Sequence, residues 1–153
     1  MYRGKPLLAH PRPRLPLVLY IISIVLSSLL FYWAGVYCRW NYYDCSETLN
    51  FPMKNREYAQ YFPIFVGPLI CLLSVMWLMT NVFYANTPCA NAYNCLEMPT
   101  AVFSSLLAGV SAVIEIHYSF DFNRLIWSEQ WSWAAADAVA LGAVHAFLAF
   151  ALQ

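Results

Sequence analysis

Four side chains capable of acid–base chemistry stand within apolar stretches of the sequence. Glu115 and His117 lie near the end of one stretch, in "SAVIEIHYSFD", and Asp137 and His145 lie in a later one. Ionisable groups inside a membrane span commonly belong to proton relays and ion pathways. Two close carboxylates do not both stay charged without a partner. If Glu115 and Asp137 are neighbours, they predict a site that binds a cation or shares a proton.

A structural role is the alternative for the two carboxylates, and we favour it. Each would then face the interior of a helix bundle or reach interfacial water. Their hydrogen-bond partners would be backbone groups or the side chains of Ser111, Tyr118 and Arg124.

The two histidines do not form an evident ligand pair. His117 stands two residues after Glu115, so it points about 200° away around a helix. His145 lies deeper in its apolar stretch, where a lone histidine is more often a hydrogen-bonded packing residue than a ligand. Because His117 lies near one end of its stretch, haem ligation by both would be strained. We therefore predict no cofactor and no metal site.

The composition is that of a membrane protein. Of the 153 residues, 61% are hydrophobic and 10% charged, and the mean hydropathy is +0.54, whereas soluble domains are roughly half apolar and a quarter charged. Four apolar runs reach the roughly 20 residues that a membrane-spanning helix needs. The predicted fold is an all-α membrane protein, a four-transmembrane-helix bundle. Its spans lie near residues 15–36, 61–84, 99–118 and 131–152, after a basic, proline-rich tail over 1–14.

Small residues recur at four-residue steps in the last two predicted spans. In lipid, close approach of small residues drives much of helix association, so these two faces are expected to pack on each other. They consist of Ser104, Ala108 and Ala112 in one span and Ala134, Ala138, Gly142 and Ala146 in the other. Pro68, in "VGPLI" of the second span, is expected to kink or start its helix.

Basic residues near the span ends predict the orientation. Four of them precede the first span, which favours a cytosolic amino terminus, although four others fall on the opposite side. The first apolar run is too long for a cleaved signal peptide. We expect both termini in the cytosol, residues 37–60 and 119–130 outside, and residues 85–98 inside. Net charge is zero and no basic block follows Arg14, so no nucleic acid is expected.

The cysteines form two pairs in loops that face opposite compartments. With the amino terminus inside, Cys38 and Cys45 are the candidate disulfide. Cys89 and Cys95 are then cytosolic thiols next to span ends, where palmitoylation occurs. The alternative is that all four cysteines are unmodified. The spacings do not suit zinc.

The chain resembles the MARVEL-type tetraspan proteins in its four spans, short basic amino-terminal tail and modest loops. The start of the third span, "LEMPTAVFSSLLAGVSAVI" with Glu97 at the boundary, and "WAAADAVALGAVHAFLAF" in the fourth are similar to that group. Tetraspanins carry a large second outer loop with a CCG motif, which is absent. Claudins have a far longer first loop.

The resemblance implies a non-enzymatic protein that organises membrane subdomains, vesicle traffic or cell-surface contacts. Membrane lipids and other membrane proteins, or a second copy, would be its partners, in the plasma membrane or endomembrane vesicles. The sequence has no phosphate-binding glycine loop and no hydrolase or metalloprotease motif. Two alternatives remain open: a small accessory subunit of a channel, transporter or respiratory complex, and a proton- or ion-conducting oligomer that uses Glu115 and Asp137.

Overall fold

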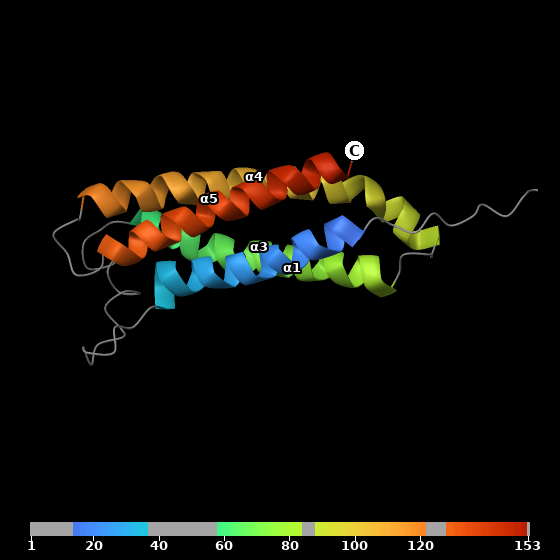
Figure 1. The fold of residues 1–153 in the computed structure, drawn as a ribbon, viewed down its shortest axis with the longest axis horizontal. Helices are drawn as coiled ribbons and strands as arrows, with labels where there is room; N and C mark the ends of the chain where they lie inside the picture. Colours follow the sequence, from blue (N-terminus) through green and yellow to red (C-terminus); the bar gives the residue numbers. More distant parts are fainter. Residues whose placement is uncertain (1–13, 37–57, 84–87, 122–127, 153) are drawn as a thin grey trace, which may run out of the picture.

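The computed structural model describes residues 14–36, 58–83, 88–121 and 128–152, and every element in these ranges is helical. Figure 1 shows four long helices side by side, with α4 and α5 as one pair and α1 and α3 as the other. The elements are α1 (Arg14–Phe31), the π-helical turn η1 (Tyr32–Val36), the 3-10 turn η2 (Tyr58–Gln60), α3 (Tyr61–Phe83), α4 (Pro88–Asp121) and α5 (Ser128–Ala151).

Each of the four helices is long and apolar enough to cross a membrane. The candidate spans are Leu15–Gly35, Tyr58–Phe83, Leu96–Asp121 and Glu129–Ala151, and their edges differ from the predicted ones by at most three residues. The predicted fold class, an all-α bundle of four such helices, is confirmed. The arrangement is that of a multi-pass integral membrane protein.

The start of α4 differs from the expectation, and Pro68 does not start its helix. Helix α4 begins at Pro88 and continues through Pro99, so the connection expected over residues 85–98 is helical for most of its length. Proline suits the first position of a helix because its missing N–H would have no partner there, and Pro88 takes that role. Pro68 likewise lies inside α3, which already begins at Tyr61.

Helices α4 and α5 pack tightly through small side chains. Ala108 and Ala112 of α4 and Ala134 and Ala138 of α5 are buried in one apolar cluster. The Ser105 hydroxyl of α4 donates a hydrogen bond across the contact to the carbonyl of Gly142, at 3.0 Å. Small residues let the two backbones come close enough for this bond.

Helices α1 and α3 approach each other at Gly67. A Cβ atom on Gly67 would lie 3.0 Å from the carbonyl oxygen of Ser27 and 3.2 Å from the Cβ of Phe31. The missing side chain therefore permits this close contact. Since both helices are otherwise lined by larger residues, Gly67 sets how close α1 and α3 lie.

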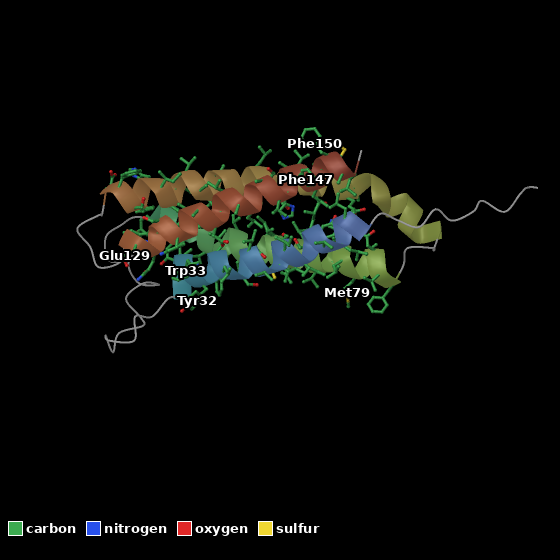
Figure 2. All side chains as sticks on the ribbon, in the orientation of Figure 1. Tyr32, Trp33, Met79, Glu129, Phe147 and Phe150 are labelled. Atoms are coloured by element: carbon green, nitrogen blue, oxygen red, sulfur yellow. The ribbon has the colours of Figure 1, made fainter. Side chains whose placement is uncertain are left out.

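Large apolar side chains cover the outside of the bundle on all four helices. Figure 2 shows Phe150 of α5 on the outside of the bundle, and Phe65 and Leu72 of α3 are 74% and 69% exposed. Such a surface is stable where lipid, not water, surrounds it. At the end of the bundle that carries Glu129, Trp33 of η1 stacks on Trp133 of α5, with ring centroids 6.3 Å apart.

Candidate functional site

The strongest polar contacts between helices inside the bundle fall into two layers, and the region between them is mostly apolar but also contains Asp137, Ser27 and Ser111. We name each layer after its glutamate. The Glu97 layer consists of Tyr20, Ser23, Ser74, Asn81, Glu97 and His145, and the Glu115 layer consists of Gln60 and Glu115.

Glu97 ties three helices together. Its Oε1 atom accepts hydrogen bonds from the Tyr20 hydroxyl of α1 and the Asn81 amide of α3, both at 2.8 Å. The Asn81 amide also donates to the carbonyl of Trp77, one turn earlier in α3, at 3.0 Å. Glu97 is only 5% exposed. Its two donors therefore replace the water that its oxygen would otherwise bind.

Ser23 of α1 connects two further helices. Its hydroxyl lies 2.8 Å from the Ser74 hydroxyl of α3 and 2.7 Å from the His145 Nε2 atom of α5. Ser23 and Ser74 are buried, and His145 is 2% exposed. The His145 Nδ1 atom is buried without a partner among the described residues. Together with Glu97, this cluster joins all four helices in one half of the bundle.

An apolar block separates this layer from the Glu115 layer. Leu30 of α1, Ile70 of α3 and Leu141 of α5 are fully buried in one apolar cluster, and Ile70 lies between Gln60 and Ser74 along the chain. The buried hydroxyls of Ser27 and Ser111 donate to carbonyls of their own helices, at 3.1 and 3.0 Å. Within the described residues, no hydrogen bond links one layer to the other.

The Glu115 layer is a single acid–amide pair. The Gln60 Nε2 group, at the end of η2, donates to the Glu115 Oε1 atom of α4 at 3.1 Å. Gln60 is 1% exposed and Glu115 0%. Their remaining oxygens, Gln60 Oε1 and Glu115 Oε2, have no partner within the described residues. One turn further along α4, the Tyr118 ring contacts Trp131 of α5, with centroids 5.7 Å apart.

Asp137 lies deeper than Glu115 and is not bonded to it. The contacts of Ser105 with Gly142 and of Tyr118 with Trp131 set an antiparallel register that places Asp137 opposite residues 110–112 of α4. At 1.5 Å per residue, this separates the two acids by about 5–8 Å along the bundle. The partner of Glu115 is Gln60, whereas the buried Oδ2 atom of Asp137 has none among the described residues.

The two histidines lie in different environments. The side chain of His117 is 62% exposed, and its Nδ1 atom lies 3.1 Å from Asp121 Oδ2, one turn later in α4. His145 is inside the Glu97 layer. In the described part of the chain, no group of three or more His, Cys, Asp or Glu side chains could hold a metal ion.

The predicted cysteine sites fall largely on residues that the structure does not describe. Cys38 and Cys45 lie outside the described ranges. Cys89 and Cys95 belong to the first turns of α4, but their side chains are not described. Cys71 of α3 is a half-buried free thiol with its Sγ atom 3.9 Å from the Ser28 hydroxyl.

The small-residue faces of α4 and α5 come together over most of their length. Ser104 is buried with the alanines described above, and Gly142 is half-buried, but Ala146 is exposed. Ala146 instead lies on an open groove of about 250 Å³ between the two helices. The other lining residues are Met98, Val102, Ser105, Leu106, Ala149 and Phe150.

Sequence reasoning missed the partners of the buried acids. Gln60 stands just before an apolar run and was not singled out, and Tyr20, Ser74 and Asn81 are single polar residues in long apolar stretches. The available signal is that an amide or hydroxyl deep in a span has to be bonded inside the bundle. That signal identifies the residues but not which of them pair.

Comparison with known proteins leaves the fold and the site as the only guides to function. No family model, no curated protein and no solved structure matches this chain.

Proposed function

We propose that this chain is a non-enzymatic membrane protein that works through lateral contacts with lipids and other membrane proteins. Such contacts would organise membrane subdomains, vesicle traffic or cell-surface contacts. The protein would reside in the plasma membrane or in endomembrane vesicles, with its amino terminus in the cytosol, as the basic residues before α1 favour.

One observation carries this proposal: the polar groups of the helices bond to one another inside the bundle. Tyr20 and Asn81 bond to Glu97, and Ser23 bonds to Ser74 and His145. Leu30, Ile70 and Leu141 fill the interior beyond them. The surface left for contact is therefore the apolar outside of the bundle, which faces along the membrane plane.

The groove between α4 and α5 is the best-shaped part of that surface. Small side chains, Ala146 and Ala149, form part of its lining, and larger ones, among them Leu106 and Phe150, surround them. A lipid chain or a partner helix gains more dispersion contact in a groove than on a flat helix face. A substitution that fills the groove should therefore change lateral contacts without disturbing the core.

The test is affinity purification of the full chain from native membranes, with lipids and proteins identified by mass spectrometry. Ala146→Leu fills the groove, and Ala136→Leu, also exposed on α5 about 15 Å away along the helix, is the matched control. We expect Ala146→Leu to lose part of the enriched set and Ala136→Leu to keep it. Enrichment of nothing above a bulk-membrane control would contradict the proposal.

One oxygen each of Glu115 and Asp137, buried without a partner among the described residues, supports the ion-conducting alternative. The apolar block described above stands against it, because ions do not cross a dry, close-packed region. Proton or cation flux through proteoliposomes of the purified chain, above that of empty vesicles, would favour this alternative. A single protein partner at fixed stoichiometry on a native gel would favour an accessory subunit.

A further inference from the structure

Two buried oxygen atoms in the Glu115 layer need a hydrogen-bond donor. Gln60 Oε1 and Glu115 Oε2 have no partner among the described residues, while the other arm of each group is used in the 3.1 Å bond from Gln60 Nε2 to Glu115 Oε1. When Glu115 is ionised, both of these oxygens can only accept hydrogen bonds. Neither can satisfy the other, so both lose hydration without compensation.

No positive side chain in the described part of the chain neutralises Glu115. Of the lysines and arginines, only Arg14 lies in the described ranges, at the opposite end of the bundle. His117 points outward to Asp121. The other titratable side chains on the surrounding elements are those of Tyr32, Tyr58, Tyr61, Tyr118, Glu129 and Asp137, and none of them is a cation. Among the described residues, a Glu115 carboxylate that is 0% exposed would be charged in an apolar interior without a counter-ion, which is strongly unfavourable.

We propose that Glu115 binds a proton on Oε2 and donates it to Gln60 Oε1, which closes a cyclic acid–amide pair. The Gln60 N–H then donates to Glu115 Oε1, and the Glu115 O–H donates to Gln60 Oε1. One proton from water is taken up, the pair becomes neutral, and both orphaned oxygens gain a partner. The ligand of this site is the proton, and the inference does not rest on the proposed function.

Loss of this proton would open the contact between η2 and α4. The O–H bond disappears, and a negatively charged Glu115 then faces the partial negative charge of the Gln60 carbonyl. Only the hydrogen bond from the Gln60 N–H group to Glu115 Oε1 then joins the two side chains. The site therefore couples the joint between η2 and α4 to the pH of the compartment on that side, with the closed state favoured at lower pH.

The decisive measurement is infrared spectroscopy of the full chain in nanodiscs at neutral pH. A protonated carboxyl group has a C=O stretch well above the bands of a carboxylate. We expect wild type to show this band and Glu115→Gln to lose it, because glutamine keeps the shape and the neutral pair. Asp137→Asn is the matched control and should keep the band.

Gln60→Leu tests the pairing itself. Removal of the hydrogen-bond partner should shift the Glu115 band to higher frequency, whereas an unmoved band would overturn the cyclic pair. If Glu115→Gln loses a carboxylate band and keeps the protonated-carboxyl band of wild type, Glu115 is ionised in wild type. That result would overturn the proposal.

If Glu115→Gln does not fold, carbon-13 labelling of the glutamates in wild type replaces it. The band must then shift with the label, and Gln60→Leu must move the labelled band. A protonated-carboxyl band that ignores the glutamate label would overturn the proposal as well.

Discussion

Gly67→Ala tests the close approach of α1 and α3. The new methyl carbon would stand 3.0 Å from the Ser27 carbonyl oxygen and 3.2 Å from the backbone nitrogen of Phe31. Close C–H···O contacts usually have carbon–oxygen distances of about 3.3–3.6 Å, so the helices must separate by a few tenths of an ångström. Because two of the obstructing atoms belong to the backbone, no rotamer change can relieve the contact.

The expected magnitude follows from two opposing effects. Overpacking a close contact typically costs about 1–3 kcal/mol, and alanine recovers up to about 1 kcal/mol over glycine in a helix. Gly109→Ala in α4 is the matched control, because a Cβ atom there meets nothing within 4 Å. Both substitutions gain the same helix preference. The difference between them therefore contains the contact and the effect of the neighbouring Pro68, and we expect Gly67→Ala to be less stable by about 1–3 kcal/mol from the contact.

Pro68 provides the second control. A proline disfavours helical geometry in the residue before it, in part through that residue's Cβ atom, so Gly67→Ala would incur this cost as well. In a Pro68→Ala background the proline effect is gone, while the contact with Ser27 remains. We expect most of the Gly67→Ala effect to persist there.

The assay is reversible unfolding of the purified full chain in mixed micelles, followed by tryptophan fluorescence. Equal stabilities for Gly67→Ala and Gly109→Ala would refute the reasoning from the α1–α3 distance. A loss that vanishes in the Pro68→Ala background would assign the effect to proline alone.

Substitutions at three further positions address the remaining contacts in the same unfolding assay. Gly142→Ala should be tolerated, because its Cβ atom would have ordinary contacts at 3.6–3.8 Å, whereas Gly142→Leu should lose about 1–3 kcal/mol by overpacking; equal stabilities would mean that the α5 face yields freely. Tyr20→Phe removes one of two donors to Glu97 and should cost about 0.6 kcal/mol, up to about 1.7, with no such loss in a Glu97→Leu background, which has no acceptor, if the bond is the cause. His145→Ala should destabilise wild type more than Ser23→Ala variants, in which its bonding partner is already missing; additive losses would show that the two side chains act independently.

The general architecture could be predicted from the sequence because it depends on local composition. Runs of about 20 apolar residues specify spans wherever they occur, so the four helices were placed correctly. The start of α4 was not, since a proline fits the first turn of a helix equally well at Pro88 and at Pro99. The hydrogen bonds of buried Glu97, further along α4, favour an early start of this helix. Those bonds depend on donors from α1 and α3.

The pairing inside the candidate site could not be predicted because it depends on the relative position of distant helices. Glu115 and Asp137 were considered as possible neighbours, but a shift of a few residues between antiparallel helices separates them. Gln60 is 55 residues from Glu115 in the chain, and nothing in the periodicity of either segment links them. The Gly67 contact is of the same kind, since a glycine in a helix reveals close approach only when the opposite backbone is known.

The hydrogen bonds of Ser23 have a consequence for how the chain is made. Ser23 belongs to the first helix and His145 to the last, 122 residues later. Glu97, the hydrogen-bond partner of Tyr20, follows it by 77 residues. As chains are built from the amino terminus, α1 enters the bilayer with polar groups that lipid cannot bond. Nascent chains should therefore stay beside the insertion machinery or a chaperone until α5 arrives, and premature stops before α5 should be degraded.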